Sequence, residues 1–180
     1  VTVSAVNVSQ RLVDVVEDAG GKLELTPIGS TRIMARIREL QTEGEHVPIA
    51  GEGNGGIIFP DYRLARDGAY IAAKFLQLVA ERSASDVVAD FDGYENVRIN
   101  VEYDSAGVRD RLLEAAQDYA RSSDAELSTI DGYRLDFGDG WVLVRPSGTE
   151  PLIRIYAEAR SAERAVTLAE QVQARLESVE

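Results

Sequence analysis

The sequence has 180 residues, enough chain for one large or two small domains with hydrophobic cores. Its hydrophobic fraction of 44% is ordinary for a globular protein, and no apolar run approaches the length of a transmembrane helix. The net charge of −12 argues against nucleic-acid binding, which requires a basic face, and the lack of cysteine excludes disulfides and thiolate chemistry. We therefore expect a cytoplasmic protein whose partners include neither nucleic acid nor membrane.

Arginine carries almost all of the positive charge, because Lys22 and Lys74 are the only lysines. A surface rich in Asp and Glu and nearly without lysine suits high salt, where screening weakens the repulsion between like charges. We predict a halophilic source on this basis. The alternative is the acidic surface of a mesophilic protein.

The first half of the chain alternates expected strands with expected helices. A buried strand over Val1–Val8 precedes the helix Gln10–Ala19, for which Ser9 is the expected N-cap and Gly20–Gly21 the end. The next elements are expected to be a strand at Leu23–Leu25, a helix at Thr31–Glu43, strands at Val47–Ala50 and Ile57–Phe59, and a helix at Asp67–Ala80 whose core-facing residues are Ile71, Phe75, Leu78 and Val79. This alternation predicts an α/β three-layer domain with a mostly parallel sheet over residues 1–85.

The second half has strands joined by tight turns, with helices early and late. Between the halves the pattern loosens around Arg82–Asn96, and we assign residues 86–95 to a linker. The expected elements beyond it are strands at Val97–Tyr103, Glu126–Ile130, Tyr133–Phe137, Trp141–Val144 and Leu152–Ala159, with helices at Ala106–Arg121 and Ala162–Leu176. Asp131-Gly132 is a strong hairpin turn. Residues 96–180 are therefore predicted to form an α+β domain with an antiparallel sheet.

A loop framed by two prolines joins the last two expected strands; we call Arg145–Pro151 the Ser147 loop. Because proline has no donor, we expect the amides between the prolines to be unengaged and to form an anion-binding concavity, in which glycine admits a positive φ. Hydroxyl donors and arginine forks suit phosphate oxygens. The candidate phosphate ligands are Arg145, Ser147, Gly148, Thr149 and Arg154, and Glu150 is expected to pair with Arg154. The alternative is an ordinary turn, since all these residue types occur in turns.

A second glycine-rich stretch, Gly51–Gly56, follows the strand expected at Val47–Ala50, and we call it the glycine loop. Ligand sites of open α/β sheets lie at the carboxyl ends of the strands, so this placement is typical of a binding site. Its glycines let the backbone approach a ligand, while Glu52 and Asn54 present a carboxylate and an amide that suit vicinal hydroxyls. The alternative is a flexible turn.

Together the two loops resemble those of the α-D-phosphohexomutases, the family that contains phosphomannomutase, phosphoglucomutase and phosphoglucosamine mutase. That family carries a Gly-Glu-x-Ser/Asn-Gly sugar loop in its third domain and an Arg-Pro-Ser-Gly-Thr-Glu-Pro type phosphate loop in its fourth. Both occur here in that order, and the resemblance covers nearly the whole chain. It implies an isomerase that interconverts hexose 1-phosphates and 6-phosphates through a bisphosphorylated sugar.

The resemblance also implies roles for particular residues. Glu52 and Asn54 would bind the 3- and 4-hydroxyls of the hexose. The segment Pro27–Arg32, here called the Pro27 loop, resembles another substrate-contact loop of the third domain; its candidate ligands are Gly29, Ser30 and Arg32. A plain helix N-cap by Ser30 is the alternative. Many bacterial members have serine at Asn54 and histidine at Gly56, so this version is more similar to archaeal members, and the preferred hexose stays open.

Neither the family's active-site serine loop nor its Asp-Gly-Asp-x-Asp-Arg metal loop occurs in this sequence. The resemblance therefore implies a third domain that lacks its beginning and a complete fourth domain, with no catalytic residue and no metal ligand in this chain. Mg²⁺ and the phosphoserine would be held by N-terminal domains of the same protein, and a hexose 1,6-bisphosphate would be activator and intermediate. By itself the chain is expected to bind hexose phosphate weakly and to be inactive.

His46, the only histidine, is expected to be solvated. The alternative function is a non-catalytic phosphosugar-binding or regulatory module.

The acidic, lysine-poor composition predicts that thermal stability rises with salt over the molar range. At 1 M salt the screening length falls to about 3 Å, which relieves repulsion between like charges. Melting curves of the purified chain in low and in molar KCl check this expectation. A melting temperature that does not move with KCl would refute the halophilic interpretation.

Overall fold

The computed structural model describes residues 2–5, 10–52, 55–89 and 93–179 of the chain. The chain divides into two compact units, Val1–Asp92 (unit 1) and Gly93–Glu180 (unit 2). The division falls inside the segment 86–95 that we assigned to a linker, of which residues 90–92 lie outside the described residues. We expect this segment to remain the connection between two separately folded domains.

Part of the expected linker is helical, because α4 covers Ala84–Ala89. Ser83 and Asp86 form a capping box at its start: the Asp86 N–H donates to Ser83 Oγ at 3.1 Å, and the Ser83 N–H donates to Asp86 Oδ2 at 3.3 Å. The polar Ser-Ala-Ser-Asp string, which we interpreted as irregular, is therefore a helix N-terminus.

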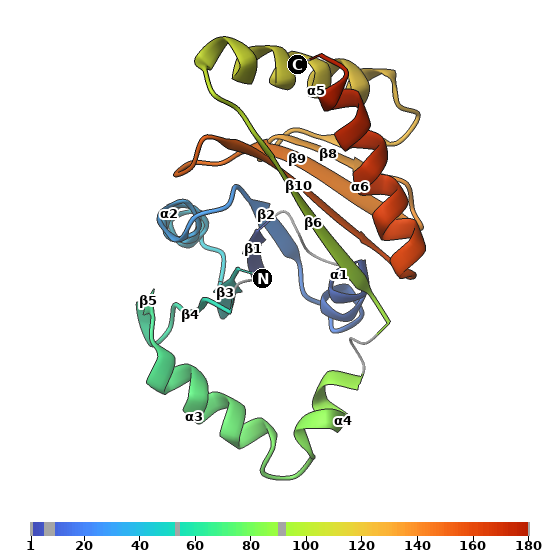
Figure 1. Cartoon of the computed structure of the whole chain (residues 1–180). Coiled ribbons are helices and arrows are strands. Elements are labelled where there is room, and N and C mark those ends of the chain that lie inside the picture. The colour runs from blue at the N-terminus through green and yellow to red at the C-terminus, as the bar shows by residue number, and fades with distance from the viewer. Residues whose placement is uncertain (1, 6–9, 53–54, 90–92, 180) are drawn as a thin grey trace. The chain divides into compact units, whose positions relative to one another are not determined.

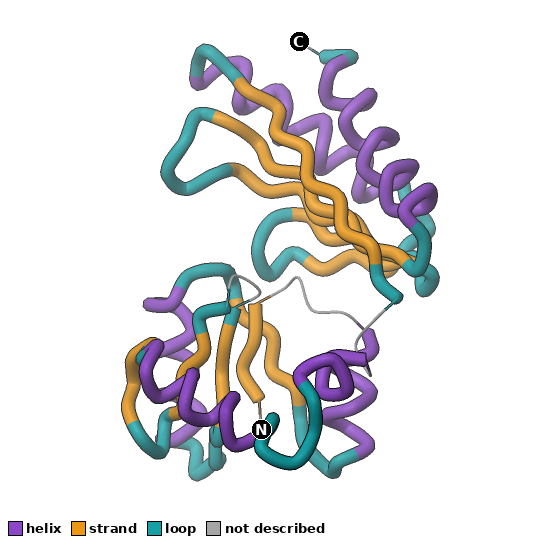
Figure 2. Tube along the Cα trace, turned by 60° about the horizontal axis from the view of Figure 1, so that its bottom comes forward, coloured by secondary structure: helices purple, strands orange, loops and turns teal. Residues whose placement is uncertain are grey.

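Unit 1 is built on a five-stranded sheet in the order β2-β1-β3-β4-β5. β1 is parallel to β2 and β3, whereas β4 is antiparallel to both β3 and β5. Figures 1 and 2 show α1 and α2 on opposite sides of this sheet, which is the predicted three-layer α/β arrangement. The elements are β1 (Thr2–Ala5), α1 (Gln10–Asp18), β2 (Leu23–Thr26), α2 (Ser30–Thr42), β3 (Ile49–Gly51), β4 (Ile57–Phe59), β5 (Arg63–Arg66) and α3 (Gly68–Leu78), followed by α4.

Most predicted elements of unit 1 are confirmed, including the end of α1 at Gly20, which has a φ of +75°. The strand β5 was not predicted, because its Arg-Leu-Ala-Arg sequence is short and charged at both ends. Residues 1 and 6–9 lie outside the described residues. They include both ends of the expected strand Val1–Val8 and the expected N-cap Ser9.

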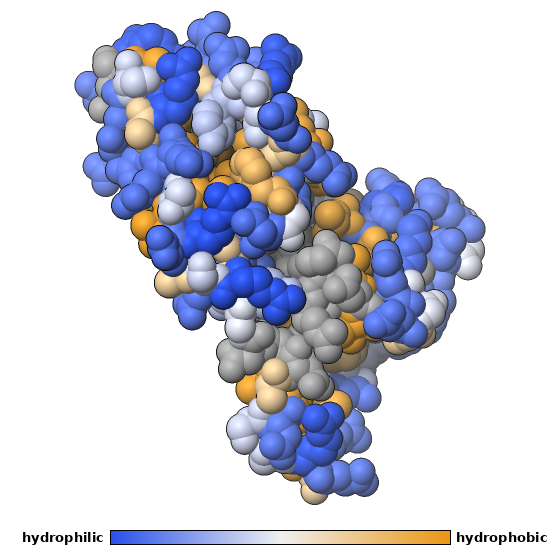
Figure 3. Space-filling model, turned by 90° about the vertical axis from the view of Figure 1, so that its right-hand side faces the viewer, coloured by the Kyte–Doolittle hydropathy of each residue, from blue (hydrophilic) through white to orange (hydrophobic). Residues whose placement is uncertain are grey.

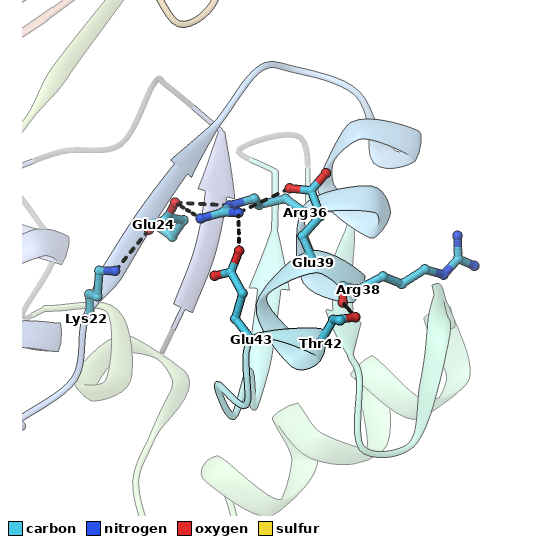
Figure 4. A network of polar contacts seen from close by, with 7 residues as sticks. All are labelled: Lys22, Glu24, Arg36, Arg38, Glu39, Thr42 and Glu43. Atoms are coloured by element: carbon cyan, nitrogen blue, oxygen red, sulfur yellow. Dashed lines mark hydrogen bonds and ion pairs between the residues drawn. The ribbon is translucent and has the colours of Figure 1, made fainter.

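A charged network ties β2 to α2 (Figure 4). Glu24 on β2 accepts hydrogen bonds from Nε and Nη2 of Arg36 at 3.1 and 2.7 Å. Arg36 also donates to Glu39 at 3.1 Å, and Lys22 Nζ lies 3.4 Å from Glu24. The hydrogen bonds from Arg36 are the main reason that the pKa of the Glu24 carboxyl lies below its ordinary value. This network holds α2 against the sheet, and the N-terminus of α2 follows the Pro27 loop.

The core of unit 1 lies between α2 and the sheet. Apolar residues at helical spacing on α2 pack against residues of the strands; the buried cluster consists of Ile33, Ile37, Leu40, Val47, Ala50 and Ile58. On α3, by contrast, no residue is buried. Our assignment of Phe75 and Leu78 to the core is wrong, since they are 44% and 60% exposed, while Ile71 and Val79 are partly buried. Apolar spacing identifies one face of a helix but does not say whether another element covers it.

Unit 2 is a five-stranded sheet in the order β6-β10-β9-β8-β7 whose neighbouring strands are antiparallel, as predicted. Both helices, α5 and α6, pack on one face of this sheet and against each other (Figure 2). Ser105 and Ser161 cap these helices by accepting hydrogen bonds from backbone N–H groups of the first turns. The elements are β6 (Glu95–Glu102), α5 (Ala106–Ser122), β7 (Glu126–Ser128), β8 (Tyr133–Asp136), β9 (Gly140–Pro146), β10 (Leu152–Ala159) and α6 (Ala162–Glu177).

The face drawn in Figure 3 is covered largely by hydrophilic residues, with smaller apolar areas between them. Within the described ranges, no helix combines the length and the apolar character that crossing a membrane would require.

The core of unit 2 predicts a large cost for truncating Ile155, which is fully buried on β10. Ile155→Ala should lower the free energy of unfolding of unit 2 by about 2–5 kcal/mol, since it removes buried methylenes and leaves a cavity. Urea unfolding followed by Trp141 fluorescence measures this, because the only tryptophan lies in this unit and is 5% exposed.

Val166→Ala is the matched control, because Val166 on α6 is 38% exposed. Its effect should stay within about 0.5 kcal/mol. Equal effects of the two substitutions would contradict the assignment of Ile155 to the core.

Candidate functional site

The glycine loop and the Pro27 loop meet at one edge of the unit 1 sheet. β2 and β3 both run parallel to β1, so the loops that follow these strands leave from the same edge. There the Gly29 N–H donates a hydrogen bond to Glu52 Oε1 at 2.9 Å. Gly29 is the N-cap of α2 and has a φ of +128°, which glycine alone adopts readily. The Glu52 carboxylate therefore lies near the N-terminus of α2, where the helix dipole favours an anion.

Glu52 is held on both of its carboxylate oxygens. Its side chain is 8% exposed, and Oε2 lies 3.4 Å from Nη1 of Arg66. The backbone closes the glycine loop, since the Glu52 N–H donates to Gly56 O at 3.0 Å and the Gly55 N–H donates to Glu52 O at 3.1 Å. A carboxylate oxygen has two acceptor sites, so each still has capacity for one more donor. The carboxylate can therefore accept from ligand hydroxyls while it keeps both protein partners.

Arg66 is a charged residue of this region that we did not predict. It ends β5 and is 48% exposed. The chain turns back twice, through β4 and then β5, and so returns to the edge of the sheet where the glycine loop lies. The next residue, Asp67, caps α3 by accepting a hydrogen bond from the Tyr70 N–H at 3.1 Å. The sequence signal for Arg66 was this Arg-Asp-Gly helix start, which we used only as a helix boundary.

The other predicted site residues of unit 1 are Asn54, Ser30 and Arg32. Asn54 lies outside the described residues, so its contact with a sugar stays a prediction. Ser30 is the first residue of α2 and not its N-cap, and no side chain caps this helix. The capping explanation that we kept as the alternative for Ser30 is therefore wrong. Arg32 lies on the first turn of α2 and is exposed.

In unit 2, Arg145 on β9 and Arg154 on β10 are direct partners in the antiparallel register. Cross-strand partners project from the same face of a sheet, so the register brings the two guanidinium groups to one face. Their side chains are only 13% and 19% exposed. The structure thus brings together two of the residues that we predicted as phosphate ligands.

Each of these arginines has an acidic partner. Asp131 Oδ2 lies 2.9 Å from Arg145 Nε, in an ion pair that is close but not aligned as a hydrogen bond. Glu150 pairs with Arg154, as predicted. Interaction with the Tyr156 side chain, and after it with Glu150, raises the pKa of Arg154 against the opposing effect of burial. Asp131 was recognised in the sequence only as a turn residue.

The amides of the Ser147 loop are more engaged than we expected. The Ser147 N–H donates to Leu152 O at 2.9 Å, and the N–H groups of Thr149 and Glu150 donate to Ser147 Oγ at 3.4 and 3.2 Å. The expectation of four unengaged amides is therefore wrong, because the serine side chain accepts from its own loop. Nothing in the described part of the chain accepts from the Gly148 N–H.

Gly148 also does not have the positive φ that we allowed for. A Cβ added to it would meet no atom within 4 Å, so the backbone here borders open space. Ser147 is half-buried, whereas Gly148 and Thr149 are exposed. The open side of the loop is therefore the side on which a ligand can approach these two residues.

A hollow of about 450 Å³ in unit 2 is lined by Glu102, Tyr103, Asp104 and Val108. It adjoins the end of the Ser147 loop, where the Tyr103 N–H donates to Pro151 O at 3.1 Å. Two carboxylates line it, so it suits an anionic ligand less well than the arginine pair does.

Among the described residues, no group of three or more His, Cys, Asp and Glu side chains is placed to hold a metal ion. His46 is exposed, as expected, and its Nε2 lies 2.9 Å from Asp61 Oδ2. Neither observation adds a reactive group to the two loop regions.

Two family models match the chain. The phosphoglucomutase/phosphomannomutase alpha/beta/alpha domain III matches residues 1–94, and the phosphoglucomutase/phosphomannomutase C-terminal domain matches residues 79–175. The chain belongs to the phosphoglucomutase/phosphomannomutase family. Its two units correspond to domain III and the C-terminal domain of that family.

One curated relative, the "Probable phosphoglucosamine mutase" of Methanopyrus kandleri, is 39% identical to this chain over 171 residues. The match covers 93% of this chain and 36% of the relative, so the chain spans about a third of the length of a curated relative that it matches.

Solved structures of the family share this fold. A phosphoglucomutase/phosphomannomutase family protein from Burkholderia thailandensis matches with a TM-score of 0.81 and 24% identity, over 99% of this chain and 37% of that one. Aspergillus fumigatus N-acetylphosphoglucosamine mutase in complex with GlcNAc-6P and magnesium matches with a TM-score of 0.64 and 15% identity, over 99% of this chain and 38% of that one.

The bond between the two loops of unit 1 predicts an effect of Glu52→Ala on stability. The substitution leaves the Gly29 N–H without its acceptor, which should cost about 1–3 kcal/mol of unfolding free energy. Chemical denaturation together with amide exchange at Gly29 measures this. Glu52→Gln is the matched control, because the amide oxygen can still accept from Gly29, and it should keep that amide protected. Equal loss of protection in both variants would contradict the role of the bond.

Proposed function

We propose that this chain is the substrate-recognition part of a phosphohexomutase that interconverts a hexose 1-phosphate and its 6-phosphate through a bisphosphorylated sugar. The observation that carries the proposal is the pair of mostly buried arginines, Arg145 and Arg154, on one face of the sheet beside the Ser147 loop. Guanidinium forks match two phosphate oxygens at once. Because the chain spans about a third of a curated relative, the reaction is proposed for a longer protein.

In this proposal unit 2 binds the phosphate that is not reacting. The ligands are the two arginines together with Ser147, Gly148 and Thr149. The Gly148 N–H and the exposed Thr149 side chain border open space, which supports direct contact with an anion. Ser147 Oγ already accepts from two loop amides, and its own O–H is then directed to the ligand as a donor.

In the same proposal, unit 1 binds the hydroxyls of the hexose. Glu52 accepts from the hydroxyls with the capacity that Gly29 and Arg66 leave on its oxygens. Asn54 is the second hydroxyl ligand, and Ser30 and Arg32 contribute from the start of α2. For the substrate we propose mannose or glucose phosphate first, with glucosamine phosphate included because of the name of the Methanopyrus relative.

Mg²⁺ does not fit the described residues of this chain, since they contain no cluster of ligands for it. We propose that Mg²⁺ and the phosphoserine belong to N-terminal domains of the full-length protein, and that a hexose 1,6-bisphosphate serves as activator and intermediate. This chain then supplies binding and orientation and is inactive by itself. A non-catalytic phosphosugar-binding module is the alternative, and assays of the full-length protein with mannose, glucose and glucosamine 1-phosphates distinguish the two.

Arg145→Ala in the full-length protein is predicted to weaken substrate binding, because it removes charge-assisted hydrogen bonds to phosphate. The expected loss is about 1.5–3 kcal/mol, and it should appear mainly in KM. Steady-state kinetics with the hexose 1-phosphate that the protein accepts measures it.

Arg121→Ala is the matched control, since Arg121 is an exposed arginine in the last turn of α5. It should leave KM and kcat unchanged. If Arg145→Ala also leaves both unchanged, the phosphate assignment of the Ser147 loop is wrong.

A further inference from the structure

Two arginines that face each other across neighbouring strands repel, and burial strengthens the repulsion. Arg145 and Arg154 are such a pair, and both are mostly buried. Like charges in direct cross-strand positions are destabilising, so the fold needs negative charge beside them when no ligand is bound. Asp131 and Glu150 supply it, but the two carboxylates are held in very different ways.

Asp131 is fixed by the fold. It precedes Gly132 in the turn between β7 and β8, and Gly132 has a φ of +97°. A Cβ added to Gly132 would lie 2.3 Å from Val144 O and 2.8 Å from Arg145 Cβ, so this turn is packed directly on the backbone that carries Arg145. The Asp131 side chain is only 13% exposed, the same as that of Arg145. Its closest approach is to Nε, the inner nitrogen of the guanidinium.

Among the described residues, the hydrogen-bond partners of Glu150 are Ser147, Leu152 and Arg154, all within four residues of it in sequence. It lies four residues before Arg154 in sequence, and its side chain is 53% exposed. An exposed carboxylate on a surface loop gives up an ion pair at little cost, because water replaces the partner.

We propose that Asp131 is a positioning residue that stays on Arg145 when phosphate binds, whereas Glu150 is a counter-ion that phosphate displaces from Arg154. The inference rests on the proposed phosphate binding by the Ser147 loop. Asp131 orients the guanidinium through its inner nitrogen, and the ligand replaces the negative charge of Glu150 beside the second arginine.

The proposal predicts opposite effects for two charge-neutralising substitutions. If the carboxylates acted only by repelling the anion, removal of either would tighten binding. We expect Asp131→Asn to weaken the binding of inorganic phosphate by about tenfold, as for one lost charge-assisted contact, because Arg145 loses its orientation. Glu150→Gln should tighten binding by about twofold, because phosphate no longer competes for Arg154.

The measurement is titration of the 180-residue chain with inorganic phosphate at constant ionic strength, followed by the amide NMR signals of Ser147, Gly148 and Thr149. In an Arg145→Ala background, Asp131→Asn should cause no further weakening, since it acts through Arg145. Weakening of the same size in that background would show a general structural effect and overturn the proposal. Unchanged or tighter binding by the single Asp131→Asn variant would also overturn it.

The side-chain signals of the wild-type chain provide a second test, which holds even if Asp131→Asn does not fold. The Nε–H signals of Arg145 and Arg154, each assigned by its loss in the Arg→Lys variant, should both respond to phosphate, and that of Arg154 should move farther, because only Arg154 exchanges its carboxylate partner. A movement of the Arg145 signal as large as or larger than that of Arg154 would overturn the proposal. If no amide of the Ser147 loop responds in the wild-type chain, the proposed phosphate binding itself fails, and this inference fails with it. A wild-type response combined with a wild-type-like Asp131→Asn variant refutes only the positioning role.

Discussion

A charged side chain can be buried only if the fold supplies a partner for it, and both candidate loop regions depend on such a side chain. In unit 1 it is Glu52, which is 8% exposed and accepts a hydrogen bond from Gly29. In unit 2 it is Arg145, which is 13% exposed and lies beside Asp131. In each case the partner comes from a different loop, and a glycine with positive φ, Gly29 or Gly132, places it there. The geometry of each loop is therefore determined largely by residues outside it.

These partners are positioned by regular structure. Gly29 is the N-cap of α2, and this helix is packed on the sheet by buried apolar residues and by the ion pairs of Arg36 (Figure 4). Asp131 follows β7 and precedes β8, and the pairing of β8 with β9 sets Gly132 against Arg145. The core of each unit thus fixes a helix position or a strand register, and these in turn place the partners of the loops.

The sequence predicted the elements that carry a strong local signal. The predicted bounds of β10, Leu152–Ala159, agree with the structure, because a proline precedes the strand and a serine N-cap follows it closely. α4 was missed because its capping box was interpreted as an irregular polar string. Whether α3 is covered depends on other elements, so the spacing of Phe75 and Leu78 could not show that they are exposed.

In the candidate site, too, local features were predicted and features that depend on distant elements were missed. Arg145 and Arg154 were found because they flank a recognisable loop, and their pairing follows from a short hairpin between adjacent strands. Asp131 and Arg66 were not found, because their contacts depend on how three strands align, which is not local information. The amides of the Ser147 loop were judged from the proline positions alone. That reasoning omitted the serine hydroxyl, which competes with any ligand for the same donors.

The ion pairs that the two arginines form without a ligand affect how the proposed reaction would release its phosphate. In the proposed binding mode, a phosphate that enters the Ser147 loop replaces one interaction that already exists, that of Glu150 with Arg154, whereas Ser147 Oγ keeps its two amides. The net binding energy in this mode is smaller than the number of donors suggests, because the contact with Arg154 replaces an existing ion pair. In the proposed mutase, one bisphosphorylated sugar has to bind in two orientations, so its phosphate has to leave this loop in every cycle. A loop whose neighbouring buried arginines have carboxylate partners of their own can release the phosphate without leaving buried charges unpaired, and this favours turnover over tight binding.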